Sequence, residues 1–298
     1  MLAKEEIEIL IKAGKTAKQI VEYAKSIIKK DMLLLEIANL IENKILSLNA
    51  KPAFPVNLSI NEIAAHSTPT YNDTTKAHGL LKVDIGIHID GLVADTAISI
   101  DLENSEENKN LIKAAEESLK KATELIKFNI PLKEIGKIIE ETCNKCNVQP
   151  IRNLSGHSIE SYNLHAGLTI PNYNNNSEIK IEEGLYAIEP FTTLQSGSGS
   201  VKEGKPSTIY HLENEGNVRD SFARQVLQFI KEEYKTLPFC SRWIQKKFST
   251  RGLLALKQIE QANLLHHYPQ LIEKSNKIVA QAEHTIVITD KEKIITTL

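Results

Sequence analysis

Residues 82–100 read KVDIGIHIDGLVADTAISI, two apolar runs separated by Asp90-Gly91. An Asp-Gly pair between apolar runs favours a two-residue type I′ turn, so the segment is predicted to form a β-hairpin. That turn places Asp84 and Asp95 on one face of the hairpin as diagonal neighbours. Two carboxylates on an apolar face repel each other unless one is protonated or a cation lies between them. The hairpin predicts either a metal site or, alternatively, one Asp facing solvent and another capping a bulge.

The rest of the chain contains both helical and strand patterns. Apolar residues at steps of three and four predict helices over residues 5–29, 32–46, 106–127 and 132–146 and a helical block over 218–272. Strands are expected over 80–89 and 92–100, among short strands and loops within 151–193, most clearly at 185–191, and again within 277–298. A loop containing SGSGS is expected at 196–200. This order of elements predicts an α+β fold.

Composition excludes several classes of protein. The chain has 298 residues, 41% of them apolar, and a formal net charge of −2, which is ordinary for a globular protein and argues against disorder. The near balance of charge gives no support for binding nucleic acid or an anionic membrane. The three cysteines cannot form a disulfide framework, and no run resembles a signal peptide or a membrane span. We therefore expect a cytoplasmic protein.

Three further segments place polar side chains among apolar ones. His157 and His165 occur in NLSGHSIESYNLHAG, Glu189 in LYAIEPFTT, and Glu283 in VAQAEHTIVIT. Taken singly, each Glu could lie at a strand edge and each His in solvent, because buried carboxylates are rare unless they are paired or bound to metal. Together with the hairpin, the set holds two Asp, one His and two Glu. This oxygen-rich set suits a pair of divalent metals.

Five motifs resemble the type 2 methionine aminopeptidases and occur in the order of that family. They are NEIAAHSTP (61–69), KVDIGIHIDGLVADTA (82–97), NLSGHSIESYNLHAGLTIPN (153–172), YAIEPFTT (186–193) and QAEHTIVIT (281–289). The resemblance implies a pita-bread catalytic domain over 1–298, of the short archaeal form. It also implies a helical insertion subdomain at 195–272 within that domain.

The resemblance implies a metal-binding role for five residues. Asp84 would chelate one of two divalent cations, and Asp95 and Glu283 would bridge both. His157 and Glu189 would complete the second site. The alternative exchanges the two histidines of one loop, so that the second of them binds metal. The cations would be cobalt, manganese, iron or zinc, because this donor set accepts each of them.

The resemblance also implies which residues contact the substrate. His66 and His165 would line the substrate site without binding metal, and His165 would stabilise the tetrahedral intermediate. Glu189 would carry the proton of the activated water to the leaving amine. The methionine side chain would contact residues whose alternative interpretation is plain core packing: Phe54, Leu164, Phe191 and Tyr268.

The implied activity is removal of the initiator methionine from nascent polypeptides when the second residue is small. An Xaa-Pro dipeptidase shares the fold and the ligands, but only 60 residues precede NEIAAHSTP, too few for the extra N-terminal domain of those enzymes. A non-enzymatic binding protein of this fold is a second alternative, and it would lack ligands. Residues 201–270 hold 11 basic and 7 acidic side chains, compatible with a ribosome-facing surface or with an ordinary solvated face. One chain carries the whole site, so a monomer is sufficient.

Two weaker motifs are interpreted as structural. Residues 199–206, GSVKEGKP, resemble a phosphate-binding loop, but Pro206 stands where Ser or Thr must reach magnesium. Cys143 and Cys146 form a lone CxxC, and a structural zinc site needs four ligands.

Overall fold

The computed structural model describes residues 2–298, so residue 1 of the expected domain lies outside the described residues. The helices are α1 (Lys4–Ile27), α2 (Leu34–Ser47), α3 (Glu106–Leu125), α4 (Leu132–Lys145), α5 (Ser221–Glu233) and α6 (Ser241–Gln261). The strands are β1 (Lys51–Pro52), β2 (Asn57–Ile60), β3 (Ile63–Ala65), β4 (Leu80–Ile89), β5 (Leu92–Asp101), β6 (Val148–Pro150), β7 (Ser155–Ile159), β8 (Thr169–Pro171), β9 (Gly184–Ile188), β10 (Phe191–Leu194), β11 (Val201–Leu212), β12 (Phe239–Cys240), β13 (Leu265–Glu273), β14 (Val279–Gln281), β15 (His284–Ile288) and β16 (Lys293–Ile295). The predicted α+β class and the first four predicted helices are confirmed. No helix within residues 2–298 is long and apolar enough to span a membrane.

The predicted hairpin is formed by β4 and β5. Asp90 and Gly91 have φ angles of 51° and 88°, the positive values that a type I′ turn requires. The register pairs Asp84 with Ala97, so Asp84 and Asp95 share one face as expected. β4 also pairs with β1 and β2, which makes the hairpin the centre of a four-stranded sheet.

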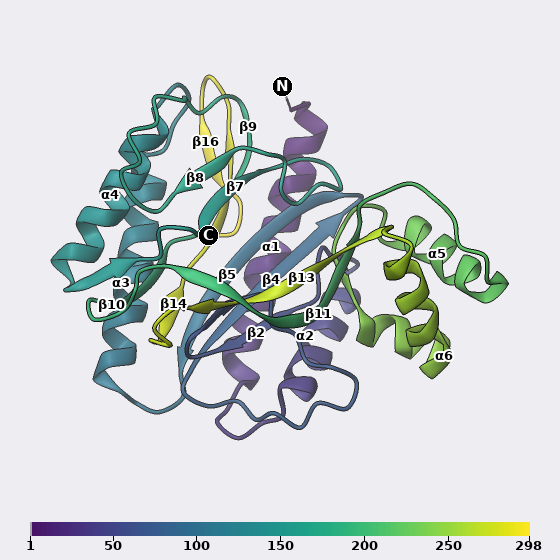
Figure 1. Ribbon diagram of the computed structural model, residues 1–298. Coiled ribbons are helices and arrows are strands. Elements are labelled where there is room, and N and C mark those ends of the chain that lie inside the picture. The colour runs from purple at the N-terminus through teal and green to yellow at the C-terminus, as the bar shows by residue number, and fades with distance from the viewer. Residues whose placement is uncertain (1) are drawn as a thin grey trace.

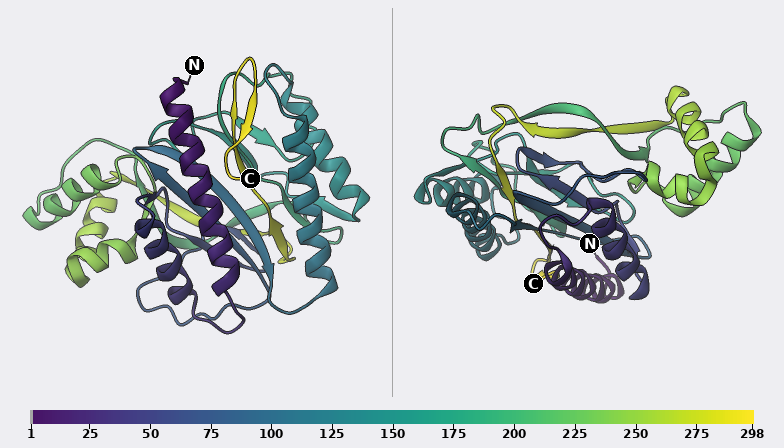
Figure 2. Two further views of the ribbon diagram at one scale, coloured as in Figure 1. Left: turned by 180° about the vertical axis from the view of Figure 1, so that it is seen from behind. Right: turned by 90° about the horizontal axis from the view of Figure 1, so that it is seen from below.

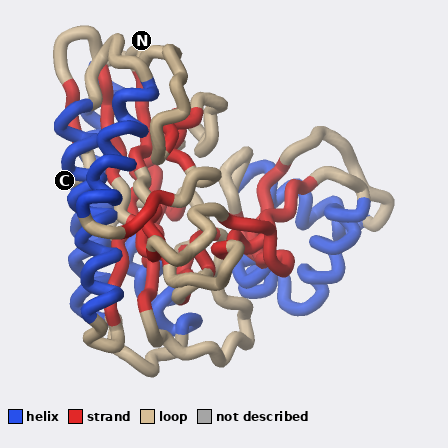
Figure 3. Tube along the Cα trace, turned by 60° about the vertical axis from the view of Figure 1, so that its left-hand side comes forward, coloured by secondary structure: helices blue, strands red, loops and turns tan. Residues whose placement is uncertain are grey.

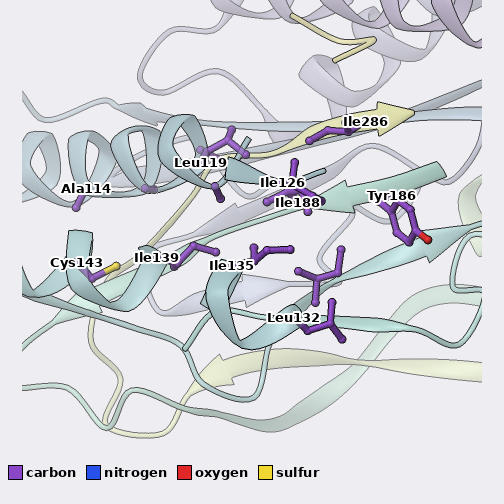
Figure 4. Packing of buried hydrophobic residues seen from close by; sticks show 14 of the residues in the cluster. Ala114, Leu119, Ile126, Leu132, Ile135, Ile139, Cys143, Tyr186, Ile188 and Ile286 are labelled. Atoms are coloured by element: carbon purple, nitrogen blue, oxygen red, sulfur yellow. The ribbon is translucent and has the colours of Figure 1, made fainter. Parts of the chain in front are cut away.

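Helices α1 to α4 cover one face of the sheets (Figures 1 and 2). The apolar sides of α1 and α2 are buried in one cluster with residues of β4 and β5. The apolar sides of α3 and α4 are buried against β9 and β15, where Leu119, Ile135, Ile188 and Ile286 meet (Figure 4). The opposite face of the sheets is left for the functional groups described below.

Two strand pairs cross together from one sheet to another. β9 and β15 pair in a five-stranded sheet, while β10 and β14 pair in a three-stranded sheet. The break between β9 and β10 is Glu189-Pro190, and the break between β14 and β15 is Ala282-Glu283. The single strand predicted over 185–191 is therefore wrong in extent, because Pro190 has no N–H to continue the ladder.

The long antiparallel pair β11–β13 extends away from α1 to α4 and carries α5 and α6 at its far end (Figures 2 and 3). The helical pattern predicted over 218–272 is correct for α5 and most of α6 but wrong for residues 265–273. These residues form β13, which pairs with β11 and β3, and Pro269 within them disfavours a helix. Strand β11 was not predicted. The segment 195–272 thus contains β11, β12 and most of β13 as well as α5 and α6, and its assignment as a helical insertion subdomain remains a proposal.

Candidate metal centre

A cavity of about 340 Å³ is lined by residues of the strands and loops, and no residue of α1 to α4 is part of its wall. Every site residue that the sequence analysis named lies in its wall: Phe54, His66, Asp84, Asp95, His157, Leu164, His165, Glu189, Phe191, Tyr268 and Glu283. These residues come from positions up to 229 apart in the sequence, from Phe54 to Glu283. The fold therefore brings the complete predicted set together.

Backbone and hydroxyl hydrogen bonds fix Asp95 and Glu283 side by side. The backbone N–H of Asp95 donates to Thr285 Oγ1 at 2.7 Å, which ties β5 to β15. The hydroxyl of Thr96 donates to the Glu283 carbonyl at 3.0 Å, and the N–H of Glu283 donates to the Ala97 carbonyl at 3.0 Å. Because these contacts use main-chain atoms, both carboxylates are left free to bind a ligand.

Glu189, at the break after β9, and His157, on the neighbouring strand β7, lie close to these two carboxylates. Glu189 follows β9, and His157 on β7 pairs with Ala187 of β9. His157 Nε2 lies 3.9 Å from Glu189 Oε1 and 3.9 Å from Asp95 Oδ2. Ligand atoms of Asp95, His157 and Glu283 all lie within 4.8 Å of one another. Distances of this size leave room for a cation between the groups rather than direct hydrogen bonds.

The raised pKa values of the four buried carboxyl groups show that the cavity lacks a compensating positive charge from the side chains that the structure describes. Burial raises the pKa of Asp84 to about 7. Burial and the neighbouring carboxylates raise the pKa values of Asp95, Glu189 and Glu283 well above their usual range. Desolvation lowers the pKa of His157 to about 3, so its imidazole is neutral and able to act as a ligand.

Unpaired oxygens show that these residues fit divalent cations. Asp84 Oδ1 and Asp95 Oδ1 are buried and have no hydrogen-bond partner among the described residues. A buried carboxylate oxygen without a partner is costly, and a cation removes that cost. Four carboxylates and one imidazole form an oxygen-rich set that suits the divalent metals named above.

His66 and His165 lie beside the carboxylates as neutral imidazoles. The His165 ring is 4.4 Å from the His157 ring, and desolvation lowers the pKa values of both His66 and His165 to about 4. His66 Nδ1 lies 3.2 Å from the Pro269 carbonyl, so it donates there and Nε2 is left as the acceptor. His66 has a φ of 59°, a left-handed conformation that is uncommon for residues other than glycine.

The apolar part of the cavity wall is tightly packed. Phe54, Leu164 and Phe191 are less than 9% exposed, and the Tyr268 ring lies 5.0 Å from the His66 ring. A Cβ at Gly86 would lie 2.1 Å from Phe54 Cε1, so only glycine allows the ring its place. These residues are both core and cavity wall, and their assignment to a methionine pocket stays a prediction.

Two polar residues of the site were not predicted. Gln281 Nε2 donates to Glu189 Oε2 at 3.3 Å and approaches Asp84 Oδ2 at 3.5 Å. Asn57 pairs with Asp84 across β2 and β4 and lines the cavity. Gln281 opens the motif QAEHTIVIT two residues before Glu283, a spacing that could have indicated it; the sequence carries no comparable signal for Asn57.

The weaker motifs lie away from this cavity. Cys143 is buried in α4 with its Sγ 3.5 Å from the Ser118 hydroxyl, which fits a structural role. Most of the segment 199–206 belongs to strand β11, so no helix N-terminus is present there to bind a phosphate.

A buried cluster of four carboxylates and one imidazole in the wall of a cavity is typical of a metal-dependent enzyme. Residues 8–290 match the metallopeptidase family M24. This chain belongs to that family and has its pita-bread fold.

Similar proteins cover nearly the whole chain. It is 46% identical to "Methionine aminopeptidase" of Pyrococcus abyssi over 98% of this chain and 99% of the relative. It is 44% identical to the protein of the same name from Methanocaldococcus jannaschii over 98% and 99%. Among solved structures, methionine aminopeptidase from Rickettsia prowazekii superposes with a TM-score of 0.71 at 20% identity over 100% and 99% of the two chains. A thermophilic Arx1 superposes with a TM-score of 0.83 at 14% identity, over 99% of this chain and 91% of the Arx1 chain.

Proposed function

We propose that this protein is a metal-dependent methionine aminopeptidase that removes the N-terminal methionine of polypeptides whose second residue is small. The observation that carries the proposal is the coincidence of two features. Curated relatives of that name are 42–46% identical over nearly the full chain, and the five donor residues meet in one buried cavity. Fold similarity alone would not support an activity, because one fold serves many functions.

We further propose that Asp84, Asp95, His157, Glu189 and Glu283 hold two divalent cations. When bound, the cations would supply an activated water and polarise the scissile carbonyl. Main-chain contacts hold Asp95 and Glu283 side by side, and no side-chain hydrogen bond occupies either carboxylate among the described residues, which supports both as residues that would hold the cations. The position of His157 Nε2, 3.9 Å from both Asp95 Oδ2 and Glu189 Oε1, supports assignment of this histidine, rather than His165, as the ligand.

The remaining steps belong to residues of the chain. Glu189, which accepts a hydrogen bond from Gln281 and has a raised pKa, is suited to take a proton and pass it to the leaving amine. His165 is neutral with an N–H to donate, so it would hold the oxygen on which negative charge develops. His66 Nε2, fixed by the Nδ1 contact with Pro269, would orient the substrate.

The apolar wall supports methionine as the first residue. Phe54, Leu164, Phe191 and Tyr268 form an apolar part of the cavity wall that suits an unbranched thioether side chain, which adapts to irregular apolar walls. We also propose a cytoplasmic monomer that acts on nascent chains, with a transient ribosome contact through the basic residues of 201–270. The physiological metal would be cobalt, manganese, iron or zinc.

The test compares two substrates with and without metal. Protein loaded with Mn²⁺ or Co²⁺ is expected to release methionine from Met-Ala-Ser, to leave Ala-Pro intact, and to lose activity in excess chelator. Cleavage of Ala-Pro with Met-Ala-Ser untouched would instead make the protein an Xaa-Pro dipeptidase. Inactivity on both peptides together with failure to bind the metal would support the binding-protein alternative.

A further inference from the structure

Two histidines face each other on the pair β11–β13, outside the carboxylate cavity. His211 of β11 is the direct cross-strand partner of His266 of β13. Their ring centroids are 5.0 Å apart, with 36° between the ring planes. Glu213, two residues along the same strand face, has Oε1 3.9 Å from His266 Nδ1. Directly opposed side chains are held in register by the ladder, so the pair is a fixed feature.

The His211 and His266 rings have nitrogen atoms that are available to bind a metal ion. His211 Nδ1 is buried and has no hydrogen-bond partner among the described residues. His267, the next residue of β13, contrasts with this because its nitrogens lie 2.7 Å from Glu260 Oε1 and 2.6 Å from the Ser207 carbonyl. His266 and Glu213 are 41% and 50% exposed, so solvent ions reach them.

We propose that His211, His266 and Glu213 form a binding site for one divalent transition-metal ion of the zinc or nickel type. Imidazole nitrogens bind such an ion at about 2.0–2.1 Å and carboxylate oxygens at about 2.0–2.2 Å, so ligand atoms 3.9 Å apart are within the reach of one ion. Two imidazoles on one tetrahedral ion have centroids roughly 5 Å apart, which matches this pair. The 3.9 Å distance joins His266 Nδ1 and Glu213 Oε1; rotation of these two exposed side chains toward His211 brings the three ligands together, and water completes the set.

The donor set distinguishes this site from the carboxylate cavity. The cavity holds four carboxylates and one imidazole, which Mn²⁺ accepts readily. The new site holds two imidazoles and one carboxylate, which favours Zn²⁺ or Ni²⁺ over Mn²⁺. Mn²⁺ therefore reports on the cavity alone, and Zn²⁺ on both sites.

A bound ion would join β11 to β13 beside the cavity wall. The Tyr268 ring lies 4.7 Å from the His266 ring and 5.3 Å from the His211 ring, and Tyr268 also lines the cavity. An ion on these histidines would stabilise the strand pair that carries this wall residue, because a ligand that binds only the folded state raises its stability.

The test counts bound ions by equilibrium dialysis in H211N, H266N, E213Q and the wild type. H78N is the matched control, since His78 is an exposed histidine whose Nδ1 contact is with the nearby Lys76 carbonyl. We expect the wild type and H78N to bind one Zn²⁺ more than H211N or H266N, with at least tenfold weaker binding in E213Q. All five proteins should bind equal Mn²⁺, which shows that the variants are folded.

Two results would overturn the proposal. One is equal Zn²⁺ binding in the wild type, H211N and H266N. The other is loss of the extra ion in H78N as well, which would indicate nonspecific binding to histidines. Absence of Mn²⁺ binding in every protein would contradict the cavity assignment instead, and the Zn²⁺ difference would still decide this site.

Discussion

Removing the divalent cations is expected to make the protein less stable as the pH rises. Burial raises the pKa of Asp84 from 3.8 to about 7. The folded metal-free protein therefore keeps a proton that the unfolded chain has already released. Stability is fully present below the unfolded pKa and is lost as the pH rises through the folded pKa. At about 1.36 kcal/mol per unit, the full loss is about 4 kcal/mol, about half of it between roughly pH 5.5 and 8.

The substitution Asp84→Asn isolates this contribution. His66, His157 and His165 have lowered pKa values and act in the opposite direction, losing stability as the pH falls below their unfolded value of about 6.5. Both proteins carry these histidines, so the difference between them cancels their effect. Asp84 also raises the pKa values of Asp95 and Glu189, and the substitution relieves that repulsion with the same sign.

Urea unfolding in excess chelator measures the free energy of unfolding of both proteins at pH 5.5 and pH 8. The advantage of Asp84→Asn over the wild type should grow by about 2 kcal/mol or more between the two pH values. With Mn²⁺ bound the order should reverse, because the wild type then keeps a ligand that the variant lacks. A metal-free difference that stays constant or shrinks as the pH rises would refute the reasoning.

Three further outcomes are expected. Glu283→Ala should lose at least one metal ion while its circular dichroism stays native, and full metal content after dialysis would contradict a ligand role. His165→Ala should keep both metals but lose about 10²- to 10³-fold in kcat, since one oxyanion donor is worth about 2.7–4 kcal/mol; if it loses a metal while His157→Ala keeps both, the two assignments are exchanged. Gly86→Ala should displace the Phe54 ring and lower kcat/KM for Met-Ala-Ser by roughly 10- to 200-fold, while the metal content stays unchanged. Steady-state kinetics and metal analysis measure the two quantities. An unchanged kcat/KM would mean that the Phe54 ring does not shape the methionine site.

Local rules were sufficient where the chain signals its own geometry. The Asp90-Gly91 turn sets the hairpin register, and the register sets which face Asp84 and Asp95 share. The helices α1 to α4 follow from their apolar periodicity to within two residues or so at each end. These features depend on residues close together in the sequence.

Long-range pairing decided what local rules missed. Strand β13 has the apolar content of the helices before it, and its partners β11 and β3 begin 64 and 202 residues earlier. The contact of Gln281 with Asp84 joins residues 197 apart, so the spacing that could have indicated Gln281 does not predict its partner. The residue types suggested that the five donors form one metal site, but their individual roles were expected only through the family resemblance, because no spacing in the sequence encodes which strands become neighbours.

The break between the two sheets explains how apolar strands deliver two acids to one cavity. If both strand pairs continued without a break, the pairing would decide which face of the sheet the Glu189 and Glu283 side chains lie on. Instead, a break separates the pair Ile188–His284 from the pair Phe191–Gln281. At this break both segments of the chain leave one sheet and enter the other. At this break neither Glu189 nor Glu283 belongs to a strand, so the pairing of neither sheet fixes the direction of their side chains. The acids are thus held by the rigid strand pairs on each side, and a cation that compensates their charge also stabilises the junction of the two sheets.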